Sequence, residues 1–95
     1  MLVFADEFRF SPSRRTLPAG VLRLQLKNIG EDDHDLRILG PKGGRKGETG
    51  IVHPDGLSQI RVTLPRGRYT FLCTVADHAK NGMRFTVTVT RRGRG

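Results

Sequence analysis

Apolar and polar residues alternate with a period of two along most of this chain. Leu22, Leu24 and Leu26 alternate with Arg23 and Gln25, which is the pattern of a strand with one buried face. The same alternation recurs in further segments: 34–38, 60–64, 69–73 and 85–89, with a shorter N-terminal strand around Phe8 and Phe10. No segment keeps a helical period for more than a turn. Several short strands at this spacing predict an all-β sandwich or barrel.

Turn-forming residues separate the predicted strands, at 18–20, 30–33, 54–56 and 65–67. Residues 40–50 are glycine-rich and basic, but their glycine spacing does not match a phosphate-binding loop. We therefore predict a mobile surface connection there. The arginine-rich residues 91–95 predict a basic flexible tail. The remaining residues, 1–90, are enough for one domain with a modest core.

The chain is strongly basic, with 17 Lys and Arg against 9 Asp and Glu and a formal net charge of +8. Such a field favours acidic partners or polyanions and accelerates their association. A nucleic-acid-binding role is disfavoured, because there is no Trp and the one tyrosine, Tyr69, is on the inward face of its predicted strand. No apolar run reaches the length of about 18 residues that a membrane-spanning helix needs.

Three side chains that bind metals lie in one short segment. The only cysteine, Cys73, is followed five residues later by His78 and five residues after that by Met83. A thiolate, an imidazole and a thioether together suit copper above other ions. One more histidine would complete a site with two histidines, one cysteine and a weak axial methionine, and His34 is the best candidate.

Strand phase supports this grouping. Cys73 shares a face with Phe71, and His34 shares a face with Ile38, so both ligand-type side chains point inward. Taken singly, Cys73 is more simply a small buried apolar residue, His34 a turn residue and Met83 a core residue. A Cys73–His78 nucleophile pair is a further alternative, but it leaves Met83 without a role and requires a buried thiol to react. Together the four residues favour a metal centre.

Four motifs follow one another in a specific order: Glu7-Phe8-Arg9-Phe10-Ser11-Pro12 leading to Leu17-Pro18-Ala19-Gly20, then His34-Asp35-Leu36, then Gly67-Arg68-Tyr69-Thr70-Phe71-Leu72-Cys73, and finally Cys-x4-His-x4-Met closing into Phe85-Thr86-Val87-Thr88-Val89. With this order and spacing, residues 4–90 resemble the cupredoxins, the small blue copper proteins similar to plastocyanin and azurin. The resemblance implies a Greek-key β-sandwich and one copper ion that cycles between Cu(II) and Cu(I).

The resemblance also implies ligand roles: His34, Cys73 and His78 as equatorial ligands and Met83 as the axial ligand. Asp35 and Thr74, each next to a ligand, are expected to tie the two ligand segments together. His53 is expected to be a turn residue outside the site.

The function expected from this resemblance is a mononuclear blue copper protein that shuttles single electrons, not an enzyme. The alternative is a copper-binding module for storage or delivery. We expect a monomer with redox protein partners, acidic ones or a membrane-associated acceptor among them, and electron exit through His78 beside Lys80 and Arg84. No secretory leader is visible, so the sequence fits either a cytosolic protein or a mature chain whose leader has been removed. With the resemblance we expect the second, an extracytoplasmic protein (periplasmic or cell-surface) whose leader is absent from this sequence.

Overall fold

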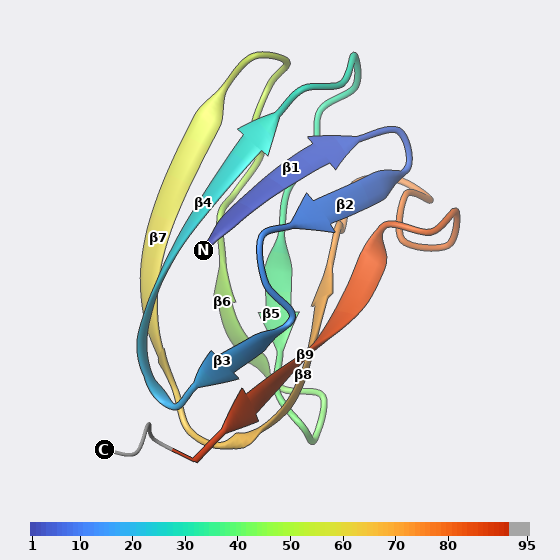
Figure 1. The fold of residues 1–95 in the computed structure, drawn as a ribbon. Helices are drawn as coiled ribbons and strands as arrows, with labels where there is room; N and C mark the ends of the chain where they lie inside the picture. The colour runs from blue at the N-terminus through green and yellow to red at the C-terminus, as the bar shows by residue number, and fades with distance from the viewer. Residues whose placement is uncertain (92–95) are drawn as a thin grey trace.

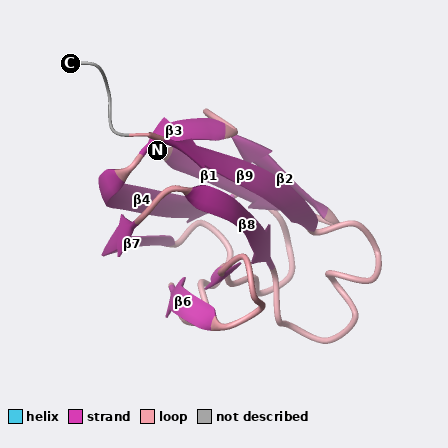
Figure 2. Ribbon diagram, turned by 90° about the horizontal axis from the view of Figure 1, so that it is seen from below, coloured by secondary structure: helices cyan, strands magenta, loops and turns pink. Residues whose placement is uncertain are grey.

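The computed structural model describes residues 1–91, which fold into two β-sheets packed face to face (Figure 1). The strands are β1 (Leu2–Asp6), β2 (Arg9–Pro12), β3 (Thr16–Pro18), β4 (Gly20–Asn28), β5 (Arg37–Leu39), β6 (Arg45–Glu48), β7 (Leu57–Leu64), β8 (Gly67–Leu72) and β9 (Arg84–Thr90). Strands and loops account for the whole of residues 1–91, which contain no helix and therefore none able to cross a membrane (Figure 2). The prediction of an all-β fold is confirmed.

The two sheets are mixed, and each contains strands that are distant in sequence. One sheet has the order β2-β1-β4-β7 and the other the order β3-β9-β8-β5-β6. β1 runs parallel to β4 and β3 runs parallel to β9, whereas the other pairings are antiparallel. Such crossovers between sheets give the Greek-key sandwich that the sequence predicts.

The core lies between the sheets and contains the inward half of each alternating strand. On β4, Leu24 and Leu26 are fully buried, whereas Arg23, between Leu22 and Leu24, is exposed. Tyr69 and Phe71 of β8 face them from the other sheet. Burying a leucine or phenylalanine side chain in this way stabilises the fold by about 1.5–3 kcal/mol.

Four segments differ from the prediction. The expected strand 34–38 is reduced to β5, because His34 forms only an isolated bridge with Val52 before the chain enters β5. The predicted loop 40–50 contains β6, which pairs with β5 as a hairpin. β1 and β3 are strands that alternation alone did not reveal. Apart from Arg91, the predicted tail lies outside the described residues.

Four connections gather at one end of the sandwich (Figure 1). They are the β1–β2 turn at 7–8, the β4–β5 connection at 29–36, the turn at 53–56 before β7, and the β8–β9 connection at 73–83. The candidate ligands lie in two of these connections. The fold therefore brings residues 34 and 73–83 together although some forty residues separate them in sequence.

Candidate metal centre

Cys73 lies immediately after β8, on the inward face that Tyr69 and Phe71 also occupy. The loop that follows closes on itself through backbone hydrogen bonds. The Cys73 amide donates to the Met83 carbonyl at 3.1 Å, and the Met83 amide donates to the His78 carbonyl at 3.0 Å. These bonds fix the backbone of Cys73, His78 and Met83 relative to one another, and the Met83 side chain is fully buried.

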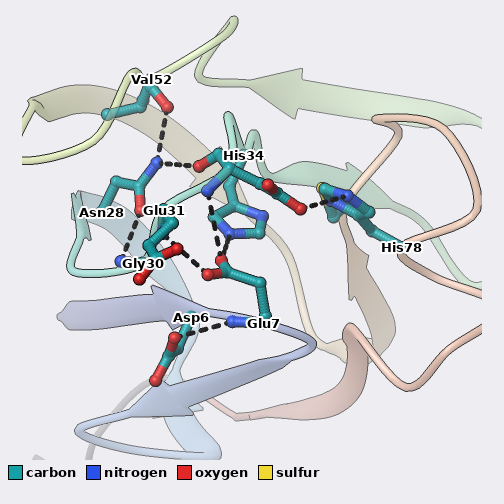
Figure 3. Close-up of polar contacts among 10 residues, drawn as sticks. Asp6, Glu7, Asn28, Gly30, Glu31, His34, Val52 and His78 are labelled. Carbon is teal, nitrogen blue, oxygen red and sulfur yellow. Dashed lines mark hydrogen bonds and ion pairs between the residues drawn. The ribbon is translucent and has the colours of Figure 1, made fainter.

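His34 is held by long-range backbone pairing. Its amide donates to the Val52 carbonyl at 3.1 Å, and the Val52 amide donates to the His34 carbonyl at 2.7 Å. The Asn28 side-chain amide donates to the Val52 carbonyl and to the Asp32 carbonyl, both at 2.8 Å. This buried asparagine therefore ties the end of β4 to the segment that carries His34 (Figure 3).

Three of the four predicted ligands converge. One potential ligand atom from each of His34, Cys73 and His78 lies within 4.8 Å of the others. The Cys73 Sγ and the His78 Nδ1 are 3.6 Å apart, and the two imidazole centroids are 4.9 Å apart. His34 is 0% exposed, Cys73 1% and His78 7%. The backbone of Met83 is held next to Cys73 and His78 by hydrogen bonds, and its side chain is fully buried.

One ring nitrogen of His34 is hydrogen-bonded, and the other has no hydrogen-bond partner among the described residues. His34 Nε2 lies 2.6 Å from the Glu7 Oε2, and the buried Nδ1 has no hydrogen-bond partner among the described residues (Figure 3). The Glu31 amide, which donates to Glu7 Oε1 at 2.7 Å, and the His34 ring hold the pKa of the Glu7 carboxyl below its usual value. Glu7 is therefore an ionised acceptor, so Nε2 carries the proton and Nδ1 presents its lone pair.

His78 has the same arrangement in a looser form. Its Nε2 lies 3.5 Å from the Asp32 Oδ2, and its Nδ1 faces the Cys73 sulfur. The Phe8 ring, from the β1–β2 turn, packs against the His78 ring with centroids 4.8 Å apart. Carboxylates behind metal-binding histidines fix the tautomer and orientation of the ring and make it a stronger ligand.

Asp35 and Thr74 connect the two ligand segments, as the sequence predicts. The Thr74 amide donates to Asp35 Oδ1 at 2.6 Å, and the Thr74 hydroxyl donates to Asp35 Oδ2. Because Asp35 follows His34 and Thr74 follows Cys73, these bonds set the separation of the imidazole and the thiol.

The thiol is poorly suited to nucleophilic catalysis. Burial raises the pKa of Cys73, and the neighbouring Asp35 carboxylate also disfavours the thiolate. A thiolate at this position requires a compensating cation. The free His34 Nδ1, the His78 Nδ1 and the Cys73 sulfur provide one thiolate and two imidazoles, a donor set that suits copper.

Sequence reasoning missed the two carboxylates behind the histidines. Glu7 is within a motif that the resemblance uses, but nothing in its spacing indicates contact with His34, and Asp32 occupies an ordinary polar turn. His53 lies outside the cluster, as predicted: its largely exposed ring is 2.8 Å from the Asp33 carboxylate.

Comparison with known proteins gives structural matches only. No protein-family model and no curated protein sequence matches the chain. The structure is similar to an auracyanin from the photosynthetic bacterium Roseiflexus castenholzii, with a TM-score of 0.83 and 23% identity over 94% of each chain. It is also similar to auracyanin A, a blue copper protein of Chloroflexus aurantiacus, with a TM-score of 0.82 and 18% identity over 95% of this chain and 97% of that one.

A purple cupredoxin from Nitrosopumilus maritimus matches with a TM-score of 0.69 and 15% identity over 94% of this chain and 98% of that one. At these identities the similarity establishes the fold. The chain therefore has the cupredoxin fold, and the resemblance of its sequence to that class is confirmed. Its histidine–cysteine–histidine cluster, with Met83 alongside, fits a type 1 centre for one copper ion.

Proposed function

We propose that this chain is a mononuclear blue copper protein that passes single electrons between redox partners. His34, Cys73 and His78 would hold the ion through Nδ1, Sγ and Nδ1, and Met83 would be the fourth and weakest donor. The observation that carries the proposal is the buried, unpartnered Nδ1 of His34 within reach of the two other donors. A buried nitrogen without a partner costs about 1–3 kcal/mol unless a ligand satisfies it.

When bound, copper supplies a one-electron Cu(II)/Cu(I) couple. The protein keeps the donors in nearly fixed positions: strand pairing holds His34, the closed loop holds Cys73 and His78, and Asp35 links the two segments. A rigid donor set limits the reorganisation that accompanies a change of charge. Burial also excludes water, which supports a carrier rather than a site that reacts with substrate.

His78 is the proposed route for the electron. Its side chain is the most exposed of the three, and the half-exposed Phe8 ring covers it. A partner that contacts the end of the sandwich would therefore meet Phe8 and the edge of His78 first. Burial of all three donors also disfavours rapid release of copper, which makes a storage or delivery module the weaker alternative.

The charge around this end favours a cationic contact surface on the partner. Although the net charge of +8 predicts acidic partners, most of the nine acidic residues lie in or beside the connections that surround the centre: Asp6, Glu7, Glu31, Asp32, Asp33, Asp35, Asp55 and Asp77. Fewer basic residues lie at the same end: Arg9, Lys27, Arg37, Lys80 and Arg84. The molecule is 41 Å long, and the Debye length at physiological salt is about 8 Å. Arginines at the far end therefore contribute little to the electrostatic potential at this surface. An extracytoplasmic location remains a prediction from the class.

The test is the visible spectrum of the chain after addition of one equivalent of Cu(II), followed by the electron self-exchange rate. We expect an intense thiolate-to-copper band, a reversible couple and fast self-exchange. If the reduced chain instead loses Cu(I) readily to a chelator, so that the visible band does not return on reoxidation, the result would support a copper-delivery module. Absence of the intense band in the folded chain would contradict the assignment of the centre.

A further inference from the structure

Exposed basic residues gather at the end of the sandwich opposite the metal centre (Figure 1). Four parts of the chain meet there: the β3–β4 turn at 19, the β5–β6 turn at 40–44, the β7–β8 turn at 65–66 and the end of β9. The exposed basic side chains that they carry, called here the basic end, are Lys42, Lys46, Arg66, Arg68 and Arg91.

Contacts between two of these turns hold the basic end together. The Pro41 ring of the β5–β6 turn packs on Gly67, so closely that a Cβ added at Gly67 would lie 2.9 Å from the Pro41 Cγ. From inside the fold, the hydroxyl of the buried Tyr69 donates a hydrogen bond to the Pro65 carbonyl at 2.6 Å. Because the turns touch and are anchored from within, their basic side chains share one surface.

The positive charge of the basic end has no local compensation. Eight of the nine acidic residues lie in or beside the connections around the metal centre, and the ninth, Glu48, pairs with Arg37 and Arg45. Among residues 1–91, no ion pair includes a residue of the basic end. The molecule therefore has one end that is purely cationic and one that is mainly anionic.

Exposed apolar residues lie among these charges. Pro18, Pro41 and Pro65 are exposed at the turns, and Val21, which follows the β3–β4 turn, is 57% exposed. A bilayer interface suits this mixture, because basic side chains attract anionic head groups and small apolar side chains can enter the head-group region. A single-stranded nucleic acid fits less well, since its bases stack on exposed aromatic rings and Tyr69, beside the β7–β8 turn, is buried.

We propose that the basic end docks on an anionic lipid bilayer and that the metal centre then faces away from the lipid. Charge complementarity carries the proposal: a bilayer of anionic head groups attracts the basic end and repels the carboxylates at the other end. The molecule is 41 Å long, several times the Debye length of about 8 Å at physiological salt, so the bilayer acts mainly on the end that is nearer to it. Docking does not depend on copper. Only its consequence, that the metal centre is presented to partners above the bilayer, rests on the proposed function.

The experiment measures cosedimentation with unilamellar vesicles, for the copper-loaded chain in its Cu(I) form and for the metal-free chain. We expect both to bind vesicles of equal parts phosphatidylglycerol and phosphatidylcholine, and neither to bind pure phosphatidylcholine. Salt at about 1 M shortens the Debye length to about 3 Å and should release the chain. With a gadolinium-chelating lipid in the vesicles, the amide signals of Gly43 and Gly67 should lose intensity before those of Gly30 and Asn81, which lie at the metal end.

Two triple variants of equal net charge separate the basic end from the overall charge. The basic-end variant combines Lys42→Gln, Lys46→Gln and Arg66→Gln. It should bind anionic vesicles about a hundredfold more weakly, since each basic residue near an anionic surface contributes about fivefold in affinity. The matched control changes three exposed basic residues of the metal end and should bind as the parent chain does: Arg9→Gln, Lys80→Gln and Arg84→Gln. Far-UV circular dichroism shows that each variant keeps the β-fold.

The proposal is overturned by equal binding to neutral and anionic vesicles, by equal losses in the two variants, or by earlier signal loss at Gly30 and Asn81. Binding to heparin without binding to vesicles would identify a soluble polyanion as the partner instead. If deletion of residues 92–95 abolished binding while the basic-end variant bound as the parent does, the contact would be the tail and not the basic end. Because the lipid series and the signal losses use the parent chain, the proposal can be refuted even if a variant does not fold. Because the metal-free chain is included, this test also stands apart from the assignment of the metal centre.

Discussion

Replacing Glu7 with glutamine removes the negative charge behind His34 while nearly preserving the size of the side chain. Glu7 accepts hydrogen bonds from the His34 Nε2 at 2.6 Å and from the Glu31 amide at 2.7 Å, and its side chain is 26% exposed. Hydrogen bonds to charged groups contribute about 1.5–3 kcal/mol each, and partial exposure favours the lower value. Glutamine retains one acceptor oxygen, so we expect metal-free Glu7→Gln to lose about 1–2 kcal/mol of unfolding free energy, and Glu7→Ala about 3 kcal/mol.

The effect on copper should be larger for Cu(II) than for Cu(I). The Glu7 carboxylate makes His34 a stronger ligand and keeps its proton on Nε2, and both effects favour the more highly charged ion. Loss of such a partner typically weakens metal binding by about 10–100-fold. We therefore expect Glu7→Gln to bind Cu(II) more weakly by about that factor, to bind Cu(I) with a smaller loss, and to have a raised reduction potential.

The assay combines urea unfolding of the metal-free chain with competitive titration of both copper states and voltammetry. Asp33→Asn is the matched control, because Asp33 is a carboxylate at the same end that pairs with the exposed His53 and not with a ligand. The control should leave copper affinity and potential unchanged. If Glu7→Gln had parental stability, Cu(II) affinity and potential, the positioning role of Glu7 would be refuted.

Further predictions address the other residues of the site. Cys73→Ser should remove the intense visible band while far-UV circular dichroism shows an intact β-fold; retention of the band would exclude the sulfur as a ligand. Met83→Leu should keep copper bound with a raised reduction potential, because loss of the thioether destabilises Cu(II) more than Cu(I). An unchanged or lowered potential in voltammetry would contradict the axial role of Met83. Asp35→Ala should lose about 2–4 kcal/mol of unfolding free energy in urea, since two hydrogen bonds from Thr74 disappear. A cationic small-molecule oxidant should react more slowly as salt rises, and the reverse trend would indicate that the net charge of the chain controls docking.

Much of the architecture follows from the sequence because side-chain phase is a local property of a strand. The alternation in β4, β7, β8 and β9 correctly predicts which residues enter the core. β1 and β3 have few residues, and β3 contains Pro18, so their pairing depends on neighbours that are distant in sequence. β6 forms in a glycine-rich segment without alternation because β5, its neighbour in sequence, provides a hairpin partner.

The ligand candidates were also accessible from the sequence. Cys73, His78 and Met83 share one connection, so their proximity requires no knowledge of the fold, and the inward phase of His34 indicates its direction. The assignment of all four as ligands stays a prediction until copper is bound. The extent of the domain, 1–90, is likewise a prediction.

Tertiary structure alone decided which partner each donor has. The Glu7–His34 and Asp32–His78 contacts join turns between different strands, and no periodicity encodes such a meeting. The same holds for the distribution of charge, since a net value of +8 does not say that most carboxylates lie around the metal end. Residue type and strand phase set what each side chain can do and which face it occupies, whereas the packing of the two sheets determines which side chains meet. In this protein the contact with Glu7 engages Nε2 of His34 and leaves Nδ1 available to a metal ion.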